Sequence, residues 1–185
     1  MLFAAAAIGA GAVGTGVGAA APVGTGVGAA AAGGAAQKGG PSAPLERATR
    51  TSGCRVRGPL PDPRCTPGAI FTRANRRAVC TRGYSSRVRH VSASLKRRVY
   101  DSYGVRHHKR GSYEVDHLVS LELGGSNDES NLFPEAANPR PGFHEKDRLE
   151  NRLHALVCDG EMSLRTAQRR IARDWLTEYR RLGLG

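Results

Sequence analysis

The N-terminal end of this sequence limits how much of the chain can contribute to a hydrophobic core. Residues 1–37 contain no charged side chain, and Val13–Pro22 (VGTGVGAAAP) returns almost unchanged as Val23–Ala32 (VGTGVGAAAA). Glycine carries a large backbone entropy cost on folding, and the small residues of this repeat cannot fill a core. We therefore expect residues 1–44 to form a disordered low-complexity tail with a short linker, and residues 45–185 to form one folded domain.

Two other interpretations of the tail stay open. A secretory signal would account for the many small residues that suit a cleavage site, although no Lys or Arg precedes the apolar run. A membrane span is disfavoured, because the run is dominated by Ala and Gly and is only weakly apolar. We favour a secreted or periplasmic location over a cytoplasmic one.

The charge of the chain points to a polyanionic partner. The formal net charge is +12 with a sequence pI near 10.4, and most basic residues lie between Arg47 and Arg110. Arg dominates over Lys, which suits forked contacts to phosphate oxygens. We expect DNA as the partner, with RNA as the alternative. The residues assigned to nucleic-acid binding are Arg73, Arg76, Arg77, Lys96, Arg97 and Arg98.

The four cysteines are Cys54, Cys65, Cys80 and Cys158, and no two of them form a Cys-x-x-Cys pair. A structural zinc site of the usual spacing is therefore disfavoured. Two disulfides would stabilise a core this small, and four reduced thiols are the alternative. If disulfides form, we expect Cys65 to pair with Cys80 across the Pro67-Gly68 turn, and Cys54 to pair with Cys158.

Hydrophobic periodicity and capping residues predict three helices in the second half of the chain. Their expected limits are Ser92 or Ser94 to Gly104, Phe143 or His144 to about Cys158, and Ser163 to Gly183. The first half is rich in Pro and Gly, which predicts an irregular basic entry to the domain.

A strand pair is predicted before the second helix. Tyr113 and Val115 alternate with polar residues, which is the period of a half-buried strand, and Asn131-Leu132-Phe133 begins a returning strand. Gly124-Gly125 forces a turn between them. The order strand, loop, strand, helix makes this a small α+β domain, closed by a C-terminal helix.

Chemistry concentrates at Asp116-His117, at the end of the first of these strands. A single-metal phosphodiesterase site needs a hard oxygen ligand for a divalent cation and a neutral His to take a proton from water. Asp116 is the candidate ligand and His117 is the candidate general base. Oxygen and imidazole ligands without thiolate favour Mg²⁺ or Mn²⁺, although Zn²⁺ or Ni²⁺ would also accept such a site.

The segment Tyr113–Asn151 resembles the H-N-H endonuclease motif, the ββα-metal finger that cuts nucleic acid. The flanking CTPGA (Cys65–Ala69), the Tyr-Gly before the core and KDRLENRLHALVC (Lys146–Cys158) are similar to small bacterial H-N-H proteins. The resemblance implies that Asn131 bridges the loop and fixes the backbone at His117, with Asn127 as a weaker competitor for that position. It also implies products with 3′-hydroxyl and 5′-phosphate ends.

The second metal ligand is less well defined by the sequence. His144 is the first candidate, but PEAANPRPGF separates it from Asn131 by more residues than the tightest form of the motif has. Asp147 or Asn151, further along the same helix, are the alternatives. We assign Arg148 to contact the scissile phosphate.

These observations predict metal-dependent endonucleolytic hydrolysis of DNA, with no small-molecule cofactor and no membrane partner. Two alternatives belong to other classes. One is a basic nucleic-acid-binding module with an inactive finger. The other is a secreted antibacterial nuclease toxin, which would have an immunity protein as its partner.

Overall fold

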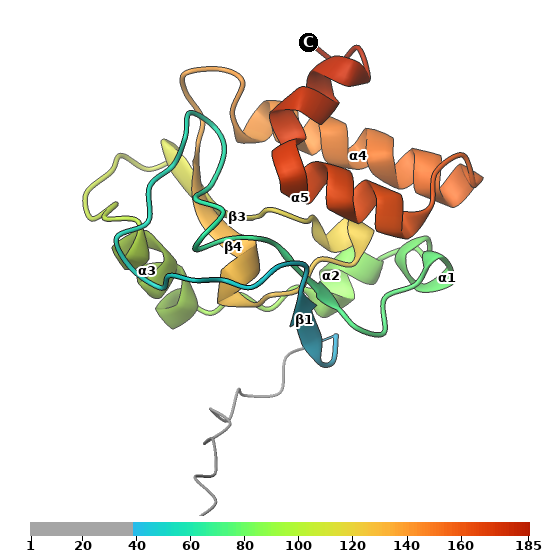
Figure 1. Cartoon of the computed structure of the whole chain (residues 1–185), viewed down its shortest axis with the longest axis horizontal. Coiled ribbons are helices and arrows are strands. Elements are labelled where there is room, and N and C mark those ends of the chain that lie inside the picture. The colour runs from blue at the N-terminus through green and yellow to red at the C-terminus, as the bar shows by residue number, and fades with distance from the viewer. Residues whose placement is uncertain (1–38) are drawn as a thin grey trace, which may run out of the picture. The chain divides into compact units, whose positions relative to one another are not determined.

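The computed structural model of this chain describes residues 39–185 (Figure 1). The expected disorder of the tail, and the secretory signal considered as its alternative, concern residues that lie outside this range. Ser42–Pro44, which the sequence placed in the linker, instead pairs antiparallel with Ala69–Phe71. The folded domain therefore begins before residue 45.

The described part of the chain is a small α+β fold, as the sequence predicted, and it has two antiparallel strand pairs where the sequence predicted one. None of its helices is long and apolar enough to cross a membrane. The elements are β1 (Ser42–Pro44), β2 (Ala69–Phe71), α1 (Arg76–Val79), α2 (Tyr84–Val88), α3 (Ala93–Ser102), β3 (Tyr113–His117), the 3₁₀ turns η1 (Leu121–Leu123) and η2 (Glu129–Asn131), β4 (Leu132–Ala136), α4 (Phe143–Asp159) and α5 (Leu164–Arg181).

The three predicted helices form α3, α4 and α5, and two of them begin at the predicted caps. The hydroxyl of Ser92 accepts a hydrogen bond from the backbone N–H of Leu95 at 3.1 Å. The hydroxyl of Ser163 accepts one from Thr166, also at 3.1 Å. These side chains satisfy backbone donors that the first turn of a helix leaves without partners. α5 contains a kink at Asp174, which the apolar pattern did not reveal.

The hairpin of β3 and β4 contains Asp116 and His117, the residues to which the sequence analysis assigned the metal and the general base. Asp116 lies opposite Phe133, and His117 lies opposite Leu132. The connection between the strands is longer than a tight turn, because residues 118–131 form two 3₁₀ turns that are mostly buried. Gly125 is required in this loop, since a Cβ atom there would lie 1.7 Å from the carbonyl oxygen of Val119.

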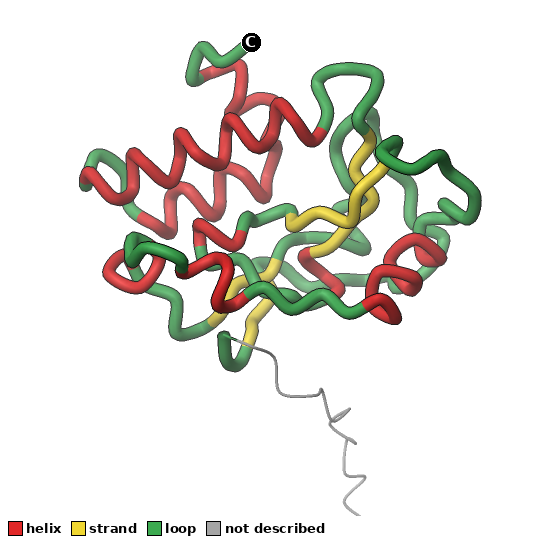
Figure 2. The backbone as a smooth tube through the Cα atoms, turned by 180° about the vertical axis from the view of Figure 1, so that it is seen from behind, coloured by secondary structure: helices red, strands yellow, loops and turns green. Residues whose placement is uncertain are grey.

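The main core lies between the β3–β4 connection and the two C-terminal helices. Figures 1 and 2 show α4 and α5 side by side, and these helices contact each other and η1. Trp175 is fully buried, and its indole N–H donates to the carbonyl oxygen of Pro59 at 3.2 Å. Other core side chains are Leu118, Val119, Leu123, Phe133, Leu149, Leu153, Val157 and Ile171. This packing fixes α4 relative to the loop that follows Asp116-His117.

Two disulfides are present, but the pairing expected from the sequence is wrong. Cys54 pairs with Cys65, and Cys80 pairs with Cys158. The first pair forms because the carboxylate of Asp62 accepts backbone N–H groups on either side of it and folds this Pro-rich segment back on itself. The second pair forms because the end of α1 meets the C-terminal end of α4, which no local turn signal could indicate.

Candidate functional site

The first feature of the site is a fully buried lysine that the sequence analysis did not single out. Nζ of Lys146, in the first turns of α4, donates to Oδ2 of Asp116 at 2.6 Å and to the carbonyl oxygen of His117 at 2.7 Å. Its third donor is directed at Oε1 of Glu150, one turn further along the helix. Oε2 of Glu135 lies 4.0 Å away. The ammonium group is therefore enclosed by acceptors from β3, β4 and α4.

The charges of this cluster depend on one another. Burial opposes the charge on Lys146, but the surrounding carboxylates outweigh it and raise the pKa of the lysine above its ordinary value. Burial also opposes the charge on Asp116, yet Lys146 holds the pKa of that carboxyl at about 2. In contrast, burial raises the pKa of Glu150 to about 8 despite the nearby lysine. Lys146 and Asp116 therefore form the ion pair at the centre of the cluster.

Glu135 is the carboxyl of the cluster to which Lys146 donates no hydrogen bond. Its side chain is fully buried, and no donor is directed at either carboxyl oxygen. Burial raises its pKa well above the usual range, with the Asp116 charge as a further cause. As a carboxylic acid, Glu135 can donate its own proton to Asp116, which gives the pair a hydrogen bond that two carboxylates could not make.

His117 is held in its neutral form by burial and in one tautomer by Asn127. The residue is 2% exposed, and desolvation lowers the pKa of its imidazole to about 4. Oδ1 of Asn127 lies 3.2 Å from Nε2 of His117. The amide orientation of Asn127 is fixed from elsewhere, because its Nδ2 donates to the carbonyl oxygen of Val88 and its Oδ1 accepts from the backbone N–H of His90. Nε2 therefore carries the proton, and Nδ1 is the proton acceptor.

Asn131 braces the loop, but it contacts residues beyond His117. Its fully buried side chain accepts from the backbone N–H groups of Val119 at 2.9 Å and Ala69 at 3.2 Å. It donates to the carbonyl oxygens of Val119 and Ser126. The Asn131 side chain thus links Ala69, Val119 and Ser126, whereas Asn127, the weaker candidate, contacts the His117 imidazole itself.

The predicted metal ligands are not gathered into one three-residue site. The ligand atoms of Asp116, His144 and Asp147 do not all lie within 4.8 Å of one another, although such a group does exist elsewhere in residues 39–185. His144 is exposed, and its ring packs against Phe143 with the centroids 4.3 Å apart. Asp147 lies within electrostatic range of Asp116, since burial and then the Asp116 charge raise the pKa of Asp147.

Glu114 joins these two carboxylates in an acidic group at the end of the hairpin. Burial raises its pKa to about 7, and the charges of Asp116 and Asp147 act in the same direction. Neighbouring carboxylates repel one another, and this repulsion raises the pKa of each. A cation placed among them would reduce the repulsion. Asp116, Glu114 and Asp147 therefore share one electrostatic region, although within residues 39–185 they do not form a three-ligand group.

Arg148 lies away from this acidic group. Its guanidinium donates to the carbonyl oxygen of Leu184 and lies 5.5 Å from the ring centroid of Tyr179. These contacts tie α4 to the C-terminal end of the chain. The structure gives Arg148 a packing role and does not support the phosphate contact predicted for it.

Besides Lys146, Arg89 is a basic residue near the site that the sequence did not single out. Asn127 holds the backbone of Val88 on one side of Arg89 and of His90 on the other. The charge of Arg89 acts on the ionisation of His117, Glu114 and Asp147. In the sequence Arg89 is one of many arginines in a basic run, so only the tertiary contact through Asn127 distinguishes it.

The residues predicted to bind nucleic acid fall into two exposed groups. One surrounds α1 and the other lies on α3. Nη2 of Arg76 donates to the carbonyl oxygen of Cys158 at 2.5 Å, which uses this arginine at the end of α4. Arg98 pairs with Glu129 at 3.2 Å. Within residues 39–185, the exposed members without such side-chain partners are Arg73, Arg77, Lys96 and Arg97.

Within residues 39–185, one group of three side chains that could bind a metal lies close together, and it consists of Cys80, His154 and Cys158. The two cysteines are joined in a disulfide, which removes the thiolates that a metal would need. Nε2 of His154 lies 3.1 Å from the carbonyl oxygen of Val79. The group therefore serves as a link between α1 and α4.

Comparison of the chain with protein-family models, with curated proteins and with solved structures finds no match in any of the three. The assignment of function therefore depends on the residues and their geometry.

Proposed function

We propose that this protein is a metal-dependent endonuclease that hydrolyses DNA phosphodiester bonds, with a ββα-metal finger of the H-N-H type as its active site. The observation that carries the proposal is a neutral, buried imidazole next to a charged carboxylate at the end of β3. Oδ1 of Asn127 accepts the hydrogen bond from Nε2 of His117, which leaves Nδ1 unprotonated and able to act as a base at neutral pH. The order of β3, β4 and α4 is that of the finger.

His117 would take the proton from the attacking water through Nδ1, and Asn131 would keep the loop after it rigid. A typical contribution of such a base is about 10²- to 10⁴-fold in rate. Asn127 acts as a positioning residue, because it sets the tautomer without contacting substrate. Arg89, whose neighbours Val88 and His90 are held by the same asparagine and whose charge acts on His117, is suited to contact the scissile phosphate in place of Arg148.

Asp116 with Asp147 would hold the divalent ion, and His144 stays as the second choice for the second ligand. Oδ2 of Asp116 already accepts from Lys146, so a metal would share this carboxylate with the ammonium group. Mg²⁺ or Mn²⁺ suits oxygen ligands of this kind, and Zn²⁺ or Ni²⁺ are the alternatives. The ion would supply electrostatic stabilisation of the charge that develops on the phosphoryl and leaving oxygens.

The test is plasmid cleavage by the purified protein with Mg²⁺ or Mn²⁺ and with excess EDTA. We expect nicking that EDTA abolishes and that His117→Ala reduces by at least about 10²-fold. His107→Ala is the matched control, because His107 is an exposed histidine in a loop. Cleavage by His117→Ala at the wild-type rate would end the general-base assignment.

A non-catalytic DNA-binding module is the second candidate. The contact between Lys146 and Asp116 favours it, because an ammonium group already neutralises the carboxylate assigned to the metal. Such a module would bind DNA with a steep salt dependence yet cut nothing with any divalent ion. Cleavage assays across Mg²⁺, Mn²⁺, Zn²⁺ and Ni²⁺ separate the two candidates.

An extracytoplasmic location accompanies the proposal. The two disulfides are compatible with an oxidising compartment, where such bonds persist. Export would be required if the nuclease acts as a secreted antibacterial toxin. Such a toxin would have an immunity protein as its partner. Cleavage of DNA by protein recovered from the culture medium would support export of an active enzyme.

A further inference from the structure

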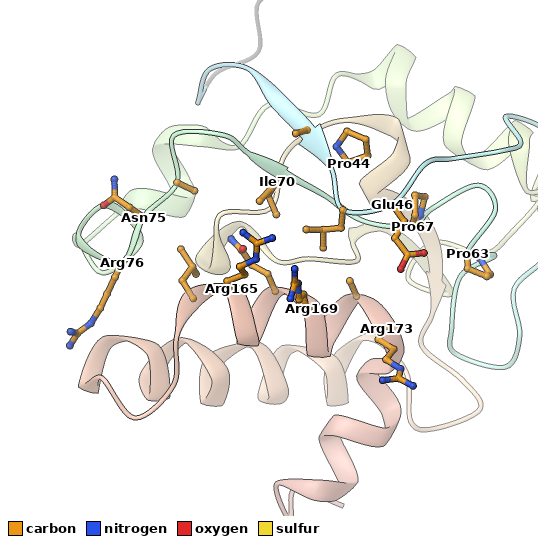
Figure 3. Close-up of a pocket in the computed structure, with 16 residues that line it drawn as sticks. Pro44, Glu46, Pro63, Pro67, Ile70, Asn75, Arg76, Arg165, Arg169 and Arg173 are labelled. Carbon is orange, nitrogen blue, oxygen red and sulfur yellow. The ribbon is translucent and has the colours of Figure 1, made fainter.

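A groove of about 1000 Å³ lies between the β1–β2 region and α5, and it shares no residue with the cluster around Asp116 and His117 (Figure 3). Its apolar lining includes Pro44, Leu45 and Ile70 from the β1–β2 side. One edge is formed by Arg165, Arg169 and Arg173 of α5. The groove therefore combines an apolar floor with a row of guanidinium groups.

The three arginines are spaced regularly and are available to a ligand. They follow one another at intervals of four residues, which places successive side chains on one helix face with a rise of about 6 Å per step. All three are exposed, and none has an ion pair within residues 39–185. By comparison, Arg170 on the same helix pairs with Glu178 at 3.6 Å. These three arginines therefore differ from arginines such as Arg170, which form ion pairs within the fold.

The charge of the groove is strongly positive. Glu46 is the acidic residue among those that line it, and Arg76 lines the end near α1 with its guanidinium directed away from the groove (Figure 3). The guanidinium of Arg76 already donates a hydrogen bond to the carbonyl oxygen of Cys158. Arginine offers paired N–H donors in a planar fork that matches phosphate oxygens, and a row of such forks can contact several phosphates of one strand.

We propose that this groove binds the sugar–phosphate backbone of DNA, as an anchoring surface separate from the site of hydrolysis. The choice of DNA as ligand rests on the proposed nuclease function, whereas the anionic character of the ligand rests on the groove itself. Arg165, Arg169 and Arg173 contact phosphates, and the apolar floor lies against sugars. Backbone contacts of this kind position a protein on DNA without reading its sequence.

The experiment compares two triple variants with equal loss of charge. Arg165→Gln/Arg169→Gln/Arg173→Gln removes the groove arginines. The control is Arg57→Gln/Arg152→Gln/Arg180→Gln, which removes three other exposed arginines that have no ion pair in the described chain. Binding of a fluorescein-labelled DNA duplex is followed by fluorescence anisotropy over a series of salt concentrations, in EDTA so that no cleavage intervenes. Thermal unfolding by circular dichroism checks that both variants are folded.

We expect the groove variant to bind DNA at least about 10-fold more weakly at low salt. The slope of log K against log salt should fall by about 3, because each phosphate contact contributes about 0.9. The control should change the slope by less than about 1. An unchanged slope in the groove variant, or an equal loss in the control, would overturn the proposal.

A polyglutamate peptide serves as the second anionic probe. If the groove variant loses affinity for the peptide and keeps its affinity for DNA, the groove takes an acidic protein and the proposal is wrong. If the proposed nuclease function is wrong, the result would differ: the wild-type protein would not cleave DNA, but it would still bind DNA more tightly than the groove variant does. If the wild-type protein cleaves, the groove variant should show a raised KM with kcat unchanged.

Discussion

Replacing Lys146 with methionine removes the charge from the buried cluster while keeping most of the side-chain volume. All three Nζ donors of Lys146 have acceptors on Asp116, His117 and Glu150, and the side chain is fully buried. Water cannot take over these contacts at a fully buried nitrogen. Removing one partner of a buried ion pair typically costs about 3–5 kcal/mol, because the remaining charge stays buried without compensation. For a domain of this size, the melting temperature should fall by about 10–20 °C.

The assay is urea denaturation at pH 7 with the disulfides intact, followed by far-ultraviolet circular dichroism and by the fluorescence of Trp175, the single tryptophan. The repair variant is Lys146→Met/Asp116→Asn, which removes the buried Asp116 charge that the single substitution leaves behind; Glu150, whose pKa burial raises to about 8, is mostly uncharged at pH 7. It should regain at least half of the lost stability, because neutral groups carry a much smaller desolvation cost.

The single variant should also be less destabilised at acid pH than at neutral pH. Loss of the ammonium raises the pKa of Asp116, so this carboxyl can protonate at acid pH and remain neutral in the folded state. A Lys146→Met protein within about 1 kcal/mol of the wild type at pH 7, or a repair variant no more stable than the single one, would refute the reasoning. If Lys146→Met does not fold, Glu150→Gln provides a milder change, with an expected loss of about 1–3 kcal/mol.

Two further predictions concern the acidic group at the end of the hairpin. The pKa of Glu114 is raised from 4.5 to about 7, so its contribution to stability is fully present below about pH 4.5 and is lost as pH rises through 7. Thermal unfolding of Glu114→Gln should therefore depend less on pH over this interval than that of the wild type. An unchanged pH profile would contradict the raised pKa of Glu114. Calorimetric titration with Mn²⁺ should show a large loss of affinity for Asp147→Ala and a smaller change, of about 10-fold or less, for His144→Ala; the reverse order would restore His144 as the second ligand.

The sequence by itself determined the elements whose causes are local. The apolar periodicity of α3, α4 and α5 and the caps at Ser92 and Ser163 act within a few residues, so these helices could be predicted with limits close to those observed. The alternation before Asp116-His117 likewise located β3. The pairing of Ser42–Pro44 with β2 was missed, because a three-residue strand carries no periodic signal and depends on a partner far away in the chain.

Tertiary structure decided which side chains surround the candidate catalytic residues. Lys146 reads as one more surface lysine in a charged helix, yet the packing of α4 against the hairpin buries it beside Asp116. Asn127 contacts His117 because the loop between β3 and β4 is folded into 3₁₀ turns, and the same contact brings Arg89 to the site. These interactions join residues from separate elements, and their energies depend on burial. Sequence spacing reports neither the distance between such residues nor the loss of solvent around them, so only the folded chain could determine them.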